Sequence, residues 1–171
     1  MRGLAAALAW WVGAGYASLG MAAPQIEPAG VVSSQPAPVC ELRAMDARSQ
    51  RELGRWPLDA QSPEIRIAFE HSVLGTTVID RYRFMPHPVL VEEEFEGEGY
   101  GLPAAPGPGE QLVRVGSRQR LLLQRPVVPL TVRAVPTQRM RVLLPQGELL
   151  LASLGASSVT LDAPGCPGAA S

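Results

Sequence analysis

The sequence has no lysine, and all fifteen of its basic residues are arginine. They nearly balance the sixteen acidic residues, so that the formal net charge is −1 at pH 7. Proteins that bind nucleic acid or an anionic membrane through a basic patch usually carry a clear positive excess. The charge balance therefore argues against both kinds of partner, and we predict no nucleic-acid binding.

Cysteine is also scarce, because the chain has only Cys40 and Cys166. Two cysteines and two separated histidines do not have the spacing of a zinc site, and the sequence indicates no metal and no cofactor. In an exported chain, an even number of cysteines favours a disulfide. We therefore expect a structural Cys40–Cys166 bridge that closes a very long loop. Two unpaired thiols are the alternative.

Export is predicted from the N-terminal residues. Met1-Arg2 is followed by an apolar run that ends in the small residues Ala22 and Ala23. A short basic region, an apolar core and a small-residue site are typical of a signal peptide. We expect residues 1–23 to be removed by cleavage near Ala23, which would leave a periplasmic protein. A retained single-pass anchor is the alternative.

Long helical patterns are missing after this leader, where no apolar spacing of 3.6 residues is sustained. Residues 24–38 are rich in proline and predict a disordered linker. Short alternating segments separated by turn signals then occupy residues 39–164, and residues 165–171 form a C-terminal tail. This pattern predicts a single all-β domain, either an antiparallel β-sandwich or a barrel-like sheet of about 8–10 short strands.

The most specific structural prediction concerns residues 64–84, whose alternating pattern indicates a β-hairpin. Apolar and polar residues alternate along both of its arms. A two-residue type II′ turn at Gly75-Thr76 would place His71 opposite Asp80, on an otherwise apolar face. We therefore expect these two side chains to meet.

A histidine opposite a carboxylate is the orienting half of a nucleophilic triad, so His71 and Asp80 make a hydrolase-like enzyme one alternative. The nucleophile is missing, however, because Ser72 is adjacent on the strand and projects to the opposite face. A buried pair whose hydrogen bonds stabilise the core is the simpler interpretation. The residues therefore favour a protein that is not an enzyme.

Glutamate is concentrated in the strand predicted over residues 89–96. Glu92 and Glu94 share one face of that strand and could bind a hard cation such as calcium. Arg81 and Arg83, on the preceding strand, are natural cross-strand partners for them. We expect a solvated face in which arginine balances glutamate. Exposed pairs of this kind contribute little stability, but they can help to select a partner.

Four segments carry a family resemblance: Phe69-Glu-His-Ser-Val, Thr76-Thr-Val-Ile-Asp-Arg-Tyr, Leu90-Val-Glu and Gly99-Tyr-Gly-Leu-Pro. Together they resemble the domain-of-unknown-function family 1850. Its members have a His-Ser-Val strand, a threonine and an acidic residue before an aromatic, a Leu-x-Glu strand and a Gly-Ala-Gly-Leu-Pro segment. The resemblance implies these candidate binding residues: His71, Ser72, Thr76, Asp80, Tyr82, Glu92, Gly99 and Gly101.

Members of that family are similar to small exported proteins that are often encoded beside the membrane component of TAXI-type TRAP transporters. The resemblance implies a non-enzymatic accessory role in solute uptake. The partner would be the membrane subunit or the solute-binding subunit, or the transported solute as a small-molecule ligand. The hairpin loop and residues 99–103 would form the contact surface. A purely structural envelope protein is the other alternative.

Overall fold

The computed structural model describes residues 39–84 and 87–167. The predictions of a signal peptide at 1–23 and a linker at 24–38 lie outside the described residues, as does the end of the predicted tail, 168–171. Within the described ranges, no helix is long and apolar enough to cross a membrane.

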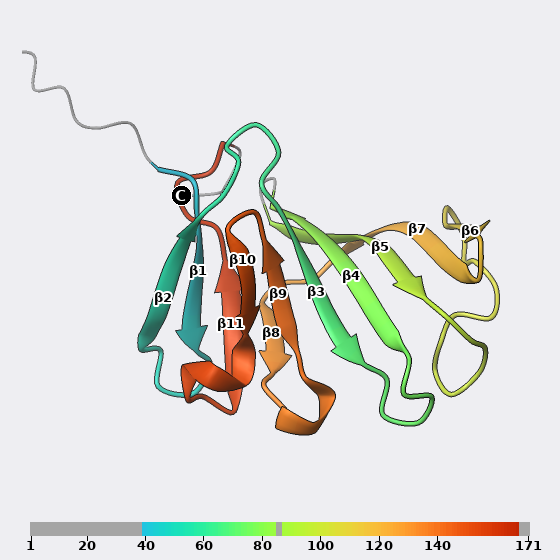
Figure 1. Ribbon diagram of the computed structural model, residues 1–171. Helices are drawn as coiled ribbons and strands as arrows, with labels where there is room; N and C mark the ends of the chain where they lie inside the picture. The colour runs from blue at the N-terminus through green and yellow to red at the C-terminus, as the bar shows by residue number, and fades with distance from the viewer. Residues whose placement is uncertain (1–38, 85–86, 168–171) are drawn as a thin grey trace, which may run out of the picture. The chain divides into compact units, whose positions relative to one another are not determined.

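In these two ranges, eleven strands form two antiparallel sheets, which confirms the predicted all-β fold class (Figure 1). One sheet has the order β2-β1-β11-β8 and the other has the order β10-β9-β3-β4-β5-β7-β6. The count lies one above the predicted range. The strands are β1 (Glu41–Asp46), β2 (Glu52–Pro57), β3 (Glu64–Glu70), β4 (Thr77–Phe84), β5 (Pro88–Phe95), β6 (Gln111–Val115), β7 (Arg118–Pro126), β8 (Leu130–Arg133), β9 (Arg141–Leu144), β10 (Gly147–Leu150) and β11 (Ser158–Asp162).

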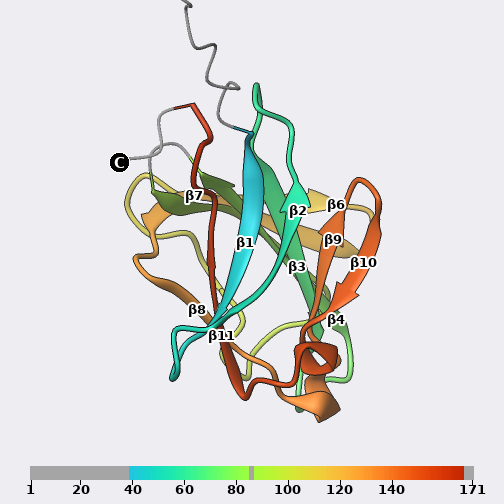
Figure 2. The ribbon, with the colours of Figure 1, turned by 90° about the vertical axis from the view of Figure 1, so that its left-hand side faces the viewer.

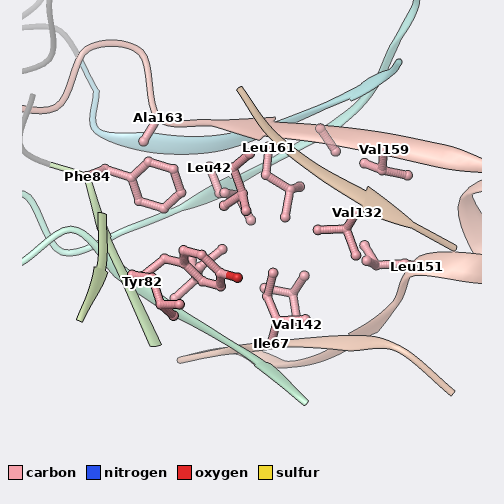
Figure 3. Close-up of a cluster of buried hydrophobic side chains, with 14 of the residues drawn as sticks. Leu42, Ile67, Tyr82, Phe84, Val132, Val142, Leu151, Val159, Leu161 and Ala163 are labelled. Atoms are coloured by element: carbon pink, nitrogen blue, oxygen red, sulfur yellow. The ribbon is translucent and has the colours of Figure 1, made fainter. Parts of the chain in front are cut away.

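The hydrophobic core lies between the two sheets, so the fold is the sandwich of the two predicted architectures. Figure 2 shows β1 and β2 of one sheet in front of β3 of the other. Leu42 and Leu161 point from the four-stranded sheet toward Ile67 and Val142 of the seven-stranded sheet (Figure 3). These four side chains are almost completely buried. Burial of each such side chain contributes about 1.5–3 kcal/mol, so this layer holds the sheets together.

A disulfide joins Cys40 to Cys166, as predicted. Both cysteines belong to the buried core, with exposed fractions of 4% and 5%. The bridge spans 126 residues of sequence and therefore connects the two ends of the described chain. In the chain-entropy model, a loop of that length stabilises the folded state by about 4–5 kcal/mol.

Removal of this bridge should lower the stability of the domain substantially. We expect the double variant Cys40→Ser, Cys166→Ser to lose about 3–5 kcal/mol of unfolding free energy, because its unfolded chain regains the entropy of an open loop. Urea denaturation at pH 7 measures the loss, and the wild-type protein in excess reductant should match the variant. A loss below about 1 kcal/mol would contradict a stabilising role.

Candidate functional site

The β3–β4 hairpin has a longer loop than the sequence predicts. Glu70 lies opposite Thr77, and Ile67 lies opposite Asp80. The loop is closed where the backbone N–H of His71 donates to the carbonyl oxygen of Thr76 at 2.9 Å. Asp80 therefore pairs four residues earlier in β3 than predicted. The predicted pairing of His71 with Asp80 is wrong.

The side chain of His71 provides the physical reason for the longer loop. Its Nδ1 accepts hydrogen bonds from the backbone N–H groups of Val73 and Leu74, each at 3.3 Å. A side chain that accepts from amides two or three residues ahead stabilises a local turn in competition with strand pairing. Gly75 completes this turn with a φ of 66° and donates its N–H to the His71 carbonyl at 2.9 Å.

The new register separates the two residues of the proposed hydrolase pair. Four residues along a strand correspond to about 13 Å. His71 is half-buried in the loop at one end of the sheet, whereas Asp80 lies within β4. The alternative of a hydrolase that uses His71 and Asp80 together is therefore not supported, because its base and its orienting carboxylate do not meet.

Two loops are instead tied together at this end of the seven-stranded sheet. The Nε2 of His71 lies 3.2 Å from the carbonyl oxygen of Tyr100. The hydroxyl of Thr76 donates to the carbonyl oxygen of Glu96 at 3.1 Å. These contacts join the hairpin loop to the glycine-rich segment that follows β5. We call residues 71–76 and 97–103 the loop surface.

The loop surface exposes one aromatic and one aliphatic side chain. Tyr100 is 70% exposed and Val73 is 61% exposed. Tyr100 has a φ of 53°, a conformation that is uncommon for residues other than glycine. Its neighbours Gly99 and Gly101 also have positive φ. Leu102 packs against the core and so anchors the segment that presents Tyr100.

The loop surface brings together five of the eight residues that the resemblance implies, namely His71, Ser72, Thr76, Gly99 and Gly101. The other three lie elsewhere on the seven-stranded sheet. Asp80 and Tyr82 belong to the inner face of β4, which faces the core. Glu92 belongs to the outer face of β5. The predicted binding residues therefore do not form one site.

Asp80 lies opposite Glu93 across β4 and β5. Residues directly opposite on antiparallel strands have Cβ atoms about 4.5–5.5 Å apart, so the two carboxylates are neighbours. We call Asp80 and Glu93 the acidic pair. The Tyr82 hydroxyl donates to Oδ2 of Asp80 at 3.3 Å. The Oδ1 atom of Asp80 is enclosed and has no hydrogen-bond partner among the described residues.

The surroundings of the acidic pair disfavour negative charge. Burial raises the pKa of Asp80 to about 7, and the charge of Glu93 adds to the rise while the hydrogen bond from Tyr82 opposes it. Burial also raises the pKa of Glu93, and the positive charge of Arg125 opposes that rise. Arg125 is shared, because it also donates to Glu110 at 3.0 Å. The pair is therefore only partly compensated by a cation.

The sequence did not predict the acidic pair, because Asp80 was assigned to His71 and the pairing of β4 with β5 was not predicted. The pairing of β5 shifts between Leu90 and Glu92, so that Leu90 and Glu93 share the inner face although simple alternation separates them. The sequence nevertheless contains a sign that Glu93 is unusual. Glu93 is the single charged residue next to Phe95 on that face, and an isolated charge at an apolar position often marks a special environment.

The outer face of this sheet carries the arginine-balanced glutamates that the sequence predicts. Arg81 donates to Glu92 at 2.9 Å. Arg83 pairs instead with Glu64 at 2.8 Å, and so it compensates β3 rather than the acidic run. In the ranges 39–84 and 87–167, no group of three or more histidine, cysteine, aspartate or glutamate residues is arranged to hold a metal ion.

The fold and the loops define an all-β sandwich domain in which a hairpin loop is tied to a glycine-rich loop. The chain belongs to the family described as Domain of unknown function (DUF1850), whose model matches residues 65–151, just over half of the chain. The match extends from β3 to β10 and so includes the loop surface and the acidic pair. No curated protein and no solved structure matches the chain.

The raised pKa of Asp80 predicts a pH-dependent stability. The folded state keeps a proton on Asp80 that the unfolded state loses above its ordinary pKa of 3.8, so the unfolding free energy should fall as pH rises from about 4 to about 7. The Asp80→Asn variant should lack this decrease in unfolding free energy. At pH 8 its unfolding free energy should exceed that of the wild type by about 2–4 kcal/mol. Urea denaturation from pH 4 to pH 8 measures both effects.

The control for this experiment is Glu98→Gln, which neutralises an exposed carboxylate. It should keep the wild-type dependence on pH. An Asp80→Asn variant that keeps that dependence as well would show that the acidic pair is not the source.

Two substitutions separate the two roles of His71. Asn can still accept from the amides of Val73 and Leu74, but it is too short to reach Tyr100, whereas Ala loses both contacts. We expect His71→Asn to keep slow hydrogen exchange at residues 73 and 74, and His71→Ala to lose about 1 kcal/mol of protection there. Equal exchange in both variants would contradict the capping role of Nδ1.

Proposed function

We propose that this protein is an exported, non-enzymatic accessory domain that contacts a subunit of a TAXI-type TRAP transporter through the loop surface. The observation that carries the proposal is the link between the two loops at His71. It joins two of the four segments that resemble the family motifs, and Val73 and Tyr100 are exposed, one on each loop. Export rests on the signal-peptide pattern of residues 1–23.

A protein contact suits the chemistry of this surface. Tyrosine is enriched at protein interfaces, because it offers a large apolar ring with a polar tip and only two side-chain torsions. Loops held on a rigid sheet are a common place for binding residues. Tyr100 meets both conditions, since Leu102 anchors its segment and its own backbone is fixed by the contact with His71.

The hydrogen bonds of His71 favour a positioning role over a catalytic one. Nδ1 accepts from two amides and must therefore be unprotonated, which leaves Nε2–H to donate to the Tyr100 carbonyl. A general base needs a ring nitrogen within reach of the substrate proton. Both nitrogens of His71 are used within the loop surface, so this residue supports the shape of a contact surface.

Site-specific photocrosslinking in cells tests the proposal. A photoreactive amino acid in place of Tyr100 should form an adduct with the membrane subunit or the solute-binding subunit of a co-expressed TAXI-type transporter, identified by mass spectrometry. The matched control is the same amino acid at Val128, which is 63% exposed but lies near Pro88, at the other end of β5. Position 128 should give no such adduct.

Two outcomes would overturn this proposal. One is equal adduct formation from positions 100 and 128, which would indicate nonspecific proximity. The other is no adduct from either position when the protein is folded and exported, which would favour a structural envelope protein.

A further inference from the structure

Two arginines lie directly opposite each other on the outer face of the seven-stranded sheet. The register of β3 and β4 pairs Arg66 with Arg81. Like charges at directly opposite positions destabilise an antiparallel pair. Arg81 is compensated by Glu64 at 3.2 Å and by Glu92 at 2.9 Å. Arg66 is exposed and makes no ion pair with any described residue.

The glutamates around this pair are already used by other arginines. Glu64 also pairs with Arg83, and Glu92 also pairs with Arg120. Glu94, the next glutamate on the outer face of β5, pairs with Arg118 and Arg120. Four arginines therefore share these three carboxylates, and Arg66 is a fifth arginine on this face that pairs with none of them, although the whole chain has a formal charge of −1. An additional anion would have to come from outside these residues.

Two hollows adjoin at the arginine pair and differ in polarity. A hollow of roughly 720 Å³ is lined almost entirely by the charged side chains of β3, β4, β5 and β7. A second hollow of roughly 210 Å³ is bordered by Leu143, Leu144 and Pro145 at the end of β9, and Glu64, which is held by Arg81 and Arg83, also lines it. Arg66 and Arg81 line both hollows. An anionic group between the two arginines would thus have an apolar wall on one side.

We propose that Arg66 and Arg81 bind the carboxylate of a small organic acid whose apolar part lies against Leu143 and Pro145. The planar guanidinium group of Arg66 can match a carboxylate with two parallel hydrogen bonds, and Arg81, whose terminal nitrogens already contact Glu64 and Glu92, adds a second positive charge beside it. An anion between the two arginines also relieves their mutual repulsion. This site is separate from the loop surface, so its failure and the failure of the transporter contact are distinguishable.

Isothermal titration of the purified protein with octanoate at 20 mM NaCl tests this site. We expect saturable binding that weakens at 200 mM NaCl, because the contact is electrostatic. Arg66→Gln should weaken binding at least tenfold, since a hydrogen bond to a charged group is lost. The matched control is Arg133→Gln on β8, which removes the same charge from an exposed position on the other sheet and should change nothing.

Two further probes separate the two halves of the site. Inorganic phosphate should bind more weakly than octanoate because it has no apolar part, and octanol should not bind because it has no charge. Without ligand, Arg66→Gln should be at least as stable as the wild type, because it removes a like-charge pair. No saturable octanoate binding, equal weakening by Arg133→Gln, or phosphate binding as tight as octanoate would overturn the proposal.

Discussion

The hydrogen bonds that His71 makes within its own turn determine how β3 pairs with β4. Because Nδ1 accepts from the two amides that follow, strand pairing ends before the loop and the register is counted from that point. The register keeps Asp80 away from His71 and places Arg66 opposite Arg81. The same ring reaches Tyr100 through its other nitrogen and joins the second loop. One side chain therefore positions residues on both loops and on both strands.

The two faces of the seven-stranded sheet differ in how their charged side chains are compensated. On the inner face, Asp80 and Glu93 face each other in a region that disfavours ionisation, and Asp80 keeps its proton to an unusually high pH. On the outer face, glutamates are surrounded by arginines, and Arg66 is left without an acidic partner among the described residues. Both features are costly for folding alone, and both lie within the segment that matches the family.

Period-two alternation was enough to predict the all-β class, most strands and the arginine-balanced face, because these depend on local sequence. The even number of cysteines similarly predicted the bridge between Cys40 and Cys166. The hairpin register was not predictable in this way, because it depends on whether the ring of His71 caps a turn. The acidic pair was missed because it depends on the pairing of β4 with β5, and the bulge after Leu90 was missed because alternation does not show where one residue is left unpaired.

The turn at His71 sets the register of the hairpin, and nuclear Overhauser contacts across β3 and β4 report that register. We expect cross-strand contacts between Ile67 and Asp80 and between Arg66 and Arg81, and no contact between His71 and Asp80. A contact between His71 and Asp80 would contradict this register. It would restore the hydrolase pair and remove the basis for both the loop surface and the arginine pair.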